Sequence, residues 1–329
     1  MRSRCKPTPF LFVSNISNIF VLQPYFLQLV FKSMYRVILL AIVSIGIADM
    51  VVWGQTKTHF AVQEDASCEK INFYLKASSG TCEIRTRNGD TPISIMGLCE
   101  EEYVTPEFGQ QMEGNVLNAW LNLNDSGKEG FTSKLTKIFG RKSTDTKNYW
   151  NIYLSHFKPY NLDLNYGVGK AYIDLSNIAV ENMKITSGNA HVKVGYHSKM
   201  ENLIEMDTFM VNVDLGDVEI DRLNMARAKT VIAEVGFGTL TMNFGESPEL
   251  ASEIWARVGA GSLTINLPLE EIPMMIRIKD TSFRKLKIPS NFVSIGDNVY
   301  VNPSYKEDSP NLLTFNIDLS MGNVIFAKN

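Results

Sequence analysis

One short pattern, a strand followed by a glycine corner and a second strand, recurs along the second half of this 329-residue chain. Its copies are LNYGVGKAYIDLS (164–176), ITSGNAHVKVGY (185–196), VNVDLGDVEIDRL (211–223), AEVGFGTLTMNFG (233–245) and ARVGAGSLTINLP (256–268). The residues that precede the second strands are spaced by 20, 27, 22 and 23: Gly169, Asn189, Gly216, Gly238 and Gly261. NIDLSMGNVIFA (316–327) is a degenerate last copy and LKASSGTCEIRT (75–86) a candidate early one. A repeat of this length is typical of stacked units that bury a core only together.

Apolar and polar residues alternate within the copies, as in a strand with one buried and one solvated face. In one copy the apolar Val218 and Ile220 oppose the acidic residues Asp217, Glu219 and Asp221. No proline occurs from 160 to 247, as expected for interior strands that donate every ladder hydrogen bond. We therefore predict an all-β fold, a β-solenoid or β-roll of stacked short strands with glycine corners. A Greek-key β-sandwich is the alternative.

The rest of the chain has a looser organisation. Further strands are expected at Ile71–Leu75, Thr81–Thr86, Ile93–Met96, Tyr149–Leu154, Met274–Ile278, Val299–Val301 and Leu312–Leu319. The polar segment 121–148 is expected to be a loop with at most one short helix. The predicted layout is an over-extended N-terminus at 1–33, a signal peptide or anchor at 34–55, a β-rich part at 56–159 and the repeated solenoid at 160–329.

The first 55 residues contain two apolar stretches, 10–31 and 37–53. The segment that begins at Met34 has a basic start at Arg36, an apolar run and small residues for cleavage near Ala48 or Gly54, which is the pattern of a secretory signal. We predict that Met34 is the true start and that the protein is exported to the periplasm or cell surface. The alternative is that the first stretch spans a membrane, although its Asn, Gln and Pro residues make it a poor span.

The exported part would be mildly acidic, with a formal charge of −7, because 1–55 contains five basic residues and one acidic residue. It therefore lacks the basic surface that nucleic acid requires, and we expect no nucleic-acid partner. It also contains Cys68, Cys82 and Cys99. In an oxidising compartment a disulfide between Cys68 and Cys82 is the first choice, and three reduced thiols are the alternative.

Two of the glycine-rich copies, 235–241 and 258–265, follow the pattern h-x-x-G-x-G-x-h-x-h in register. With the run 162–174 they give the region 160–328 a sequence that resembles the bacterial toast-rack family of adhesin-like proteins. That family is similar to the C-terminal domain of LiaF-like cell-envelope stress proteins. The resemblance implies an extracytoplasmic β-solenoid without enzymatic residues. LiaF-like proteins carry several membrane spans before this domain, whereas this chain has one signal-like segment.

No group of residues forms a clear catalytic, cofactor or metal site. The Gly-x-Gly pairs precede alternating strands, whereas a dinucleotide loop opens a helix. Asp214, Asp217, Glu219 and Asp221 form the densest acidic patch, which calcium or polysaccharide cleavage could use, but a solvated strand face is the simpler interpretation. His191 and His197 are six apart, which fits no common zinc pattern.

Aromatic residues are the remaining candidates for ligand binding. Trp120, Trp150, Trp255 and Tyr166 would stack on sugar rings if exposed, but we expect them in the core. We therefore assign no site residues and no cofactor, and predict a non-catalytic, adhesin-like or envelope-associated binding protein. Its partner is expected to be a cell-envelope protein or a glycan, with membrane contact only through an uncleaved N-terminal segment. The alternatives are a β-helix enzyme acting on polysaccharide and a LiaF-like regulator of a membrane stress sensor.

Overall fold

The computed structural model describes residues 56–63, 65–99, 104–125, 148–279 and 285–328. The predicted segments 1–33 and 34–55 lie outside these residues, as does 126–147 of the polar segment. Nearly all regular structure in the described ranges is β, with one short 3-10 helix, η1 (Leu223–Ala226). The strands join into a single hydrogen-bonded sheet that folds back on itself. The predicted all-β solenoid is therefore confirmed.

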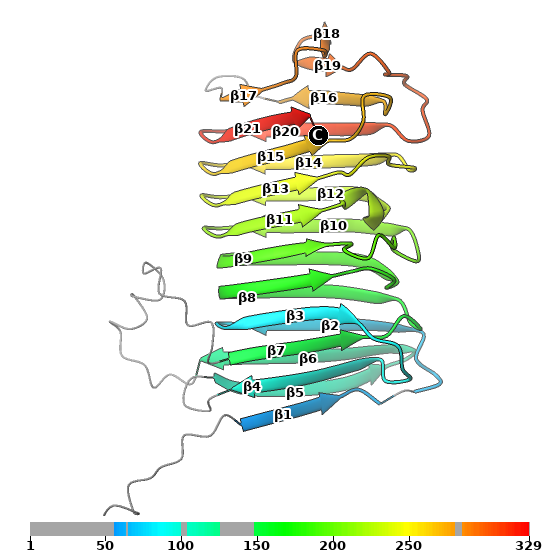
Figure 1. The fold of residues 1–329 in the computed structure, drawn as a ribbon, viewed down its shortest axis with the longest axis vertical. Helices are drawn as coiled ribbons and strands as arrows, with labels where there is room; N and C mark the ends of the chain where they lie inside the picture. Colours follow the sequence, from blue (N-terminus) through cyan, green and yellow to red (C-terminus); the bar gives the residue numbers. More distant parts are fainter. Residues whose placement is uncertain (1–55, 64, 100–103, 126–147, 280–284, 329) are drawn as a thin grey trace, which may run out of the picture. The chain divides into compact units, whose positions relative to one another are not determined.

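Two runs of parallel strands form opposite faces of the solenoid, one behind the other in Figure 1. Face A consists, in spatial order, of β6 (Val116–Asp125), β2 (Lys70–Ala77), β8 (Tyr160–Asp174), β9 (Val180–Gly195), β10 (Met206–Val213), β12 (Ala228–Val235), β14 (Ser252–Val258), β20 (Leu313–Leu319) and β16 (Met274–Ile278). Face B consists of β7 (Asn148–Leu154), β3 (Thr81–Thr86), the second halves of β8 and β9, β11 (Asp217–Asp221), β13 (Thr239–Asn243), β15 (Ser262–Leu267), β21 (Asn323–Lys328) and β17 (Leu286–Lys287).

The order of the coils in space differs from their order in the chain at both ends. The coil β2–β3 lies between the later coil β6–β7 and β8. At the other end, β20–β21 is inserted between β14–β15 and the earlier coil β16–β17. The copy at 316–327 is therefore the last in sequence but not in the stack. Strands from both sides of residue 160 belong to this one stack.

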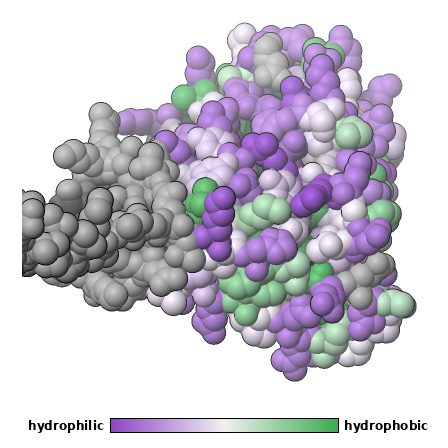
Figure 2. Space-filling model, turned by 60° about the horizontal axis from the view of Figure 1, so that its bottom comes forward, coloured by the Kyte–Doolittle hydropathy of each residue, from purple (hydrophilic) through white to green (hydrophobic). Residues whose placement is uncertain are grey.

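Antiparallel strands close the two ends. At one end β1 (Thr56–Ala61) pairs with β4 (Ile93–Cys99), which pairs with β7, and β5 (Val104–Glu113) pairs with β6. At the other end β19 (Val299–Val301) pairs with β16 and with β18 (Val293–Gly296). Phe60 of β1 and Phe108 of β5 stack 5.1 Å apart over the first core layers. Figure 2 brings this end forward and shows apolar patches surrounded by hydrophilic residues.

The core lies between the two faces and follows the predicted alternation. Val218 and Ile220 are buried, while Asp217, Glu219 and Asp221 point to the outer side. Near the C-terminal end, Phe315 contacts the rings of Phe244 and Phe326 edge to face, with centroids 5.5 and 5.4 Å apart. The buried column continues through every coil, so no coil has a core of its own.

The glycine corners bring successive coils into direct backbone contact. A Cβ on Gly238 would lie 2.2 Å from the carbonyl oxygen of Gly216, and one on Gly261 would lie 2.4 Å from that of Gly238. The anchor at Asn189 was wrong by one residue, because Gly169 pairs with Ala190. The residue before each of these corner glycines projects outward: Leu215 is 56%, Phe237 73% and Met321 74% exposed.

The expected strands are all present, and Thr81–Thr86, Met274–Ile278 and Val299–Val301 match their predicted bounds. The start of the polar loop was wrong, because Leu121–Asp125 continues β6. This part of β6 keeps the alternation: Leu121 and Leu123 are fully buried. Five strands at the ends of the stack were not predicted from the sequence: β1, β5, β6, β17 and β18.

Candidate binding site on the outer surface of face A

Outward side chains of face A line up in rows, because parallel strands in register place equivalent residues side by side. One such row near the C-terminal end crosses β12, β14, β20 and β16 through Ile232, Trp255, Asn316 and Arg277. We name it the indole row. Trp255 faces outward because its neighbours Ile254 and Ala256 fill the core.

A second row, two residues further along each strand, alternates in charge. This charged row consists of Glu234, Arg257, Asp318 and Lys279. Arg257 Nη1 lies 3.3 Å from Glu234 Oε1, Arg257 Nε lies 3.9 Å from Asp318 Oδ2, and Lys279 Nζ lies 3.1 Å from the same oxygen. Exposed pairs of this kind contribute little to stability, so their groups are available to a ligand.

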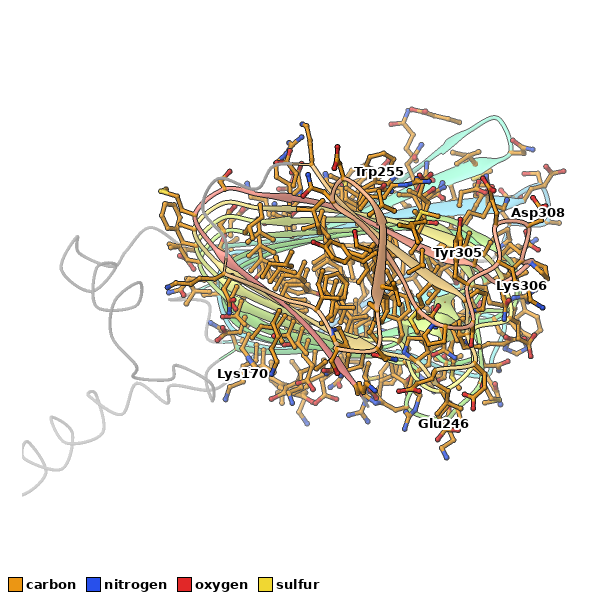
Figure 3. All side chains as sticks on the ribbon, turned by 90° about the horizontal axis from the view of Figure 1, so that it is seen from above. Lys170, Glu246, Trp255, Tyr305, Lys306 and Asp308 are labelled. Carbon is orange, nitrogen blue, oxygen red and sulfur yellow. The ribbon has the colours of Figure 1, made fainter. Side chains whose placement is uncertain are left out.

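The two rows border a shallow groove of about 330 Å³, which we name the Trp255 groove. Trp255 is 48% exposed in it, a large fraction for an indole. Seen along the stack in Figure 3, Trp255 lies on the outer side opposite to Lys170. Asn316 Nδ2 donates to Glu253 Oε1 over 3.3 Å beside the indole row. The groove therefore combines one flat apolar surface with acids, bases and an amide.

Towards the N-terminal end, face A carries a ladder of asparagines instead. Each amide donates to the side-chain carbonyl oxygen of the asparagine in the next coil, in the order Asn182, Asn161, Asn72 and Asn118, over 3.0, 2.9 and 2.8 Å. Such a ladder satisfies its own hydrogen bonds and fixes the register of four coils. We assign it a structural role.

The acidic patch on β11 does not converge on a site. Glu219 lies in the row Tyr172, Lys193, Glu219, Thr241 and Thr264, so no ladder of acids forms. Lys193 Nζ lies 2.8 Å from Glu219 Oε2, and this hydrogen bond raises the pKa of Lys193. Asp221 Oδ2 lies 3.4 Å from Arg222 Nη1. Among the described residues, no group of three or more His, Cys, Asp and Glu could hold a metal ion.

The histidines and the remaining acid of the patch lie apart. His191 lies beside Asp217 in the row across β9 and β11. His197 is exposed in the turn after β9, where its backbone N–H donates to Asp174 Oδ1. Asp214 lies at a corner, where its carbonyl oxygen accepts from the N–H groups of Phe237 and Gly238.

The amides of the Gly-x-Gly corners are also engaged. Gly236 and Gly259 donate to the carbonyl oxygens of Val213 and Val235, and Gly261 donates to that of Gly236. A phosphate loop needs free N–H groups at the start of a helix, and these corners open strands instead.

The aromatic residues divide between core and surface. Trp150 and Tyr166 are buried, as expected. Trp120 is half-buried and packs on Gly109, where a Cβ would lie 2.1 Å from the indole. The expectation was wrong for Trp120, which lies on the outer side of β6, and for Trp255, which stands in the groove. Alternation in β14 was the available signal, because it places Trp255 opposite two core residues.

The expected disulfide is absent. Cys68 and Cys82 are free, buried thiols, and Cys99 is buried too. Burial raises the pKa of the Cys82 thiol from 9.0 to about 12. Because the thiol ionises at a lower pH in the unfolded chain than in the folded protein, the free energy of unfolding falls as the pH rises from 9 to about 12. Below about pH 9 the thiol is neutral in both states and the folded protein keeps its full stability.

We expect the Cys82 thiol to resist alkylation by iodoacetamide in the folded protein at pH 8. With its pKa near 12, only about one thiol in 10⁴ is ionised at that pH, and the side chain is 1% exposed. Mass spectrometry of digested samples checks which cysteines are modified before and after unfolding in urea. A Thr239→Cys variant, exposed on β13, is the control that should react rapidly. Rapid reaction of Cys82 in folded protein would contradict its burial.

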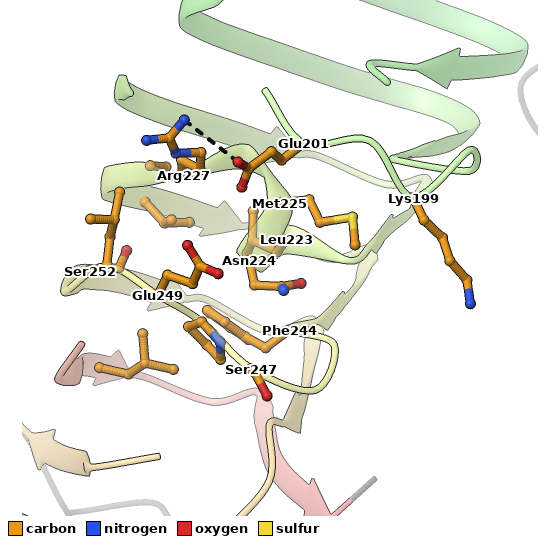
Figure 4. A pocket seen from close by; sticks show the side chains of 15 residues that line it. Lys199, Glu201, Leu223, Asn224, Met225, Arg227, Phe244, Ser247, Glu249 and Ser252 are labelled. Carbon is orange, nitrogen blue, oxygen red and sulfur yellow. Dashed lines mark ion pairs between the residues drawn. The ribbon is translucent and has the colours of Figure 1, made fainter. Parts of the chain in front are cut away.

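A small pocket of about 200 Å³ lies beside η1, at the edge of the solenoid opposite to the glycine corners (Figure 4). Leu223 and Phe244 form its apolar floor, and Arg227 Nη1 lies 3.8 Å from Glu201 Oε1 at its rim. Ligand sites usually enclose ~300–1,000 Å³, so this pocket is small for an organic ligand. Its charged residues are two acids and two bases, Glu201, Glu249, Lys199 and Arg227, which do not point to one chemistry.

Within the described ranges, no helix has the length and apolar character needed to cross a membrane.

Three solved structures share a distant likeness with the chain. A candidate cell adhesion protein from Clostridium sporogenes is 16% identical, covers 84% of this chain and 100% of its own, and has a TM-score of 0.41. A candidate adhesin from Bacteroides fragilis has 12% identity, 83% and 96% coverage and a TM-score of 0.33. A candidate lipid binding protein from Parabacteroides distasonis has 10% identity, 83% and 96% coverage and a TM-score of 0.29. These likenesses are too distant to carry an argument.

A comparison with protein-family models identifies the family of the chain. No curated protein matches the chain. The model of the N-terminal domain of toast-rack proteins, DUF2154, matches residues 57–220. The match begins before the region 160–328 that resembled the family and overlaps it from 160 to 220. It spans the strands from β1 to β11, which include the closing strands of one end, the asparagine ladder and the first glycine corners. The chain belongs to the toast-rack family.

Proposed function

We propose that this chain is a non-catalytic, adhesin-like protein of the cell envelope that binds a partner through the outer surface of its stacked strands. The observation that supports this proposal is the arrangement of outward side chains in rows that run across several coils. Such rows present a broad, regular surface, whereas catalysis needs a few groups that converge around one reacting bond.

The acidic patch gives little support to the enzymatic alternative. A glycosidase places two carboxyl groups on either side of the scissile bond. Asp217, Glu219 and Asp221 instead follow one another along a single strand, and Glu219 is already paired with Lys193. Export of the protein to the periplasm or the cell surface is inferred from the signal-like segment 34–55.

Protease accessibility tests the proposal in cells. Antibody to residues 313–328 follows the C-terminal coil in intact, osmotically opened and detergent-lysed cells, the last giving the intrinsic digestion rate. We expect digestion in intact or opened cells, under conditions that leave a cytoplasmic marker protein undigested. Digestion only together with that marker would overturn the proposed location. New reducing ends on glycans incubated with the purified protein, lost with Asp217→Ala, would overturn the non-catalytic role.

A further inference from the structure

The indole of Trp255 offers a flat apolar surface of the size of one sugar ring. It is 48% exposed on a strand that is paired on both sides, and its neighbours in the indole row are Ile232 and Asn316. Sugar rings have an apolar C–H face that packs on aromatic rings while their hydroxyl groups remain at the rim. The first requirement of a sugar site is therefore present.

The charged row lies where those hydroxyl groups would be. Trp255 and Arg257 point to the same side, two residues apart, which is about 7 Å along a strand, and adjacent strands are about 4.8 Å apart. A ring stacked on Trp255 therefore places its edge over Arg257 and Asp318. The carboxylate accepts hydrogen bonds from hydroxyl groups, and the guanidinium donates to hydroxyl oxygens.

The balance of charge selects against other ligands. The charged row contains two acids and two bases in alternation, so it lacks the positive field that nucleic acid or anionic lipid requires. A helical peptide would need several apolar anchors in line, and the groove offers one large exposed aromatic residue. Its volume of about 330 Å³ lies within the usual range of small-ligand sites.

We propose that the Trp255 groove is a glycan-binding site, in which Trp255 stacks on a sugar ring and the charged row holds its hydroxyl groups. This proposal rests on the proposed function and names the class of ligand that the surface binds. Arg277, at the end of the indole row, adds a positive charge that would favour a sugar carrying a carboxylate.

Calorimetric titration of the full-length protein with chitotetraose, cellotetraose and tetragalacturonate tests the site. We expect binding of at least one of them, with affinity reduced about tenfold or more by Trp255→Ala and less by Trp255→Phe. Asp318→Asn should weaken binding too, because it replaces a charged acceptor with a neutral amide. A preference for tetragalacturonate that Arg277→Gln removes would assign that side chain to the ligand carboxylate.

Tyr74→Ala is the matched control. Tyr74 is 45% exposed on β2 and occupies an outward position of face A, distant from the groove along the stack. Its loss should leave glycan affinity unchanged, and unchanged urea midpoints should show that all variants fold. Equal weakening by Tyr74→Ala would overturn the assignment to this groove.

Two results would overturn the glycan site without touching the proposed function. One is the absence of binding to all three oligosaccharides. The other is binding that Trp255→Ala leaves intact. In both cases the cellular digestion experiment can still place the protein in the envelope, so the failure of the site and the failure of the proposed function are distinguishable. Loss of binding to a purified envelope protein, rather than to a glycan, on Trp255→Ala would also reject this ligand class.

Discussion

Replacing Gly238 with alanine is expected to lower the free energy of unfolding by about 3 kcal/mol or more. The new Cβ would lie 2.2 Å from the carbonyl oxygen of Gly216 and 2.7 Å from Val213 Cγ1. That oxygen accepts the 2.9 Å hydrogen bond from the N–H of Thr239, so it cannot move away without breaking the contact between coils. Urea unfolding followed by circular dichroism measures the loss.

Gly236→Ala is the matched control, two residues away in the same corner. Its Cβ would lie 3.2 Å from the carbonyl oxygen of Asp214, a tight contact that a small shift relieves. Asp214 and Ser320 occupy the equivalent position in other coils, so the stack accepts a side chain there. We expect a loss of about 1 kcal/mol or less. Equal losses for the two variants would show that the close approach at Gly238 does not limit the corner.

The same corner shows what the sequence could and could not predict. The pattern of glycines located the turns, because in most coils the close contact with the neighbouring coil leaves no room for a Cβ. The same pattern could not show that Ala190, and not Asn189, stands beside Gly169 in the next coil. Strand β9 runs through this corner without a break, so no turn marks the position in the sequence. In most corners glycine is needed to avoid a carbonyl oxygen, and a positive φ occurs at Gly169.

The order of the coils could not be predicted at all. Local alternation determines which side chains enter the core, but every coil offers the same edge to its neighbours. β8 pairs with β2 and not with the preceding coil β6–β7, and β20 pairs between β14 and the earlier β16. Both placements depend on which strand edges the end strands cover. Cys68 precedes β2 and Cys82 lies in β3 of the same coil, so the extended strand β2 lies between them and their spacing in the sequence was a poor guide to a disulfide.

The binding site was predictable in part. Alternation in β14 was sufficient to turn Trp255 outward once the strand was located. The alignment of Trp255 with Asn316, and of Arg257 with Asp318, joins residues more than 60 positions apart and depends on the inserted coil β20. The sequence therefore contained the aromatic candidate but not the groups that surround it.

Asn202→Ala is expected to lower the free energy of unfolding by about 2–4 kcal/mol. Asn202 is fully buried in the loop before β10, where its side chain replaces a strand partner. Its Oδ1 accepts from the N–H of Val180 over 2.8 Å, and its Nδ2 donates to the carbonyl oxygens of Val180 and Ile204 over 2.7 and 2.8 Å. Alanine leaves all three backbone groups without this partner, away from water.

Asn182→Ala, in the partly exposed asparagine ladder, is the control, and we expect it to cost about 1 kcal/mol or less because water can replace the lost partner. Asn202→Asp separates the roles of the two side-chain atoms. It keeps the acceptor for Val180 but turns a second oxygen toward two carbonyl groups, so burial raises its folded pKa above the unfolded value near 3.9. Relative to the unchanged protein, Asn202→Asp should therefore be less stable at pH 7 and recover as the pH falls and the carboxyl group gains a proton to donate. A deficit that stays constant from pH 7 to 4 would show that the donor side of Asn202 is not what holds this loop.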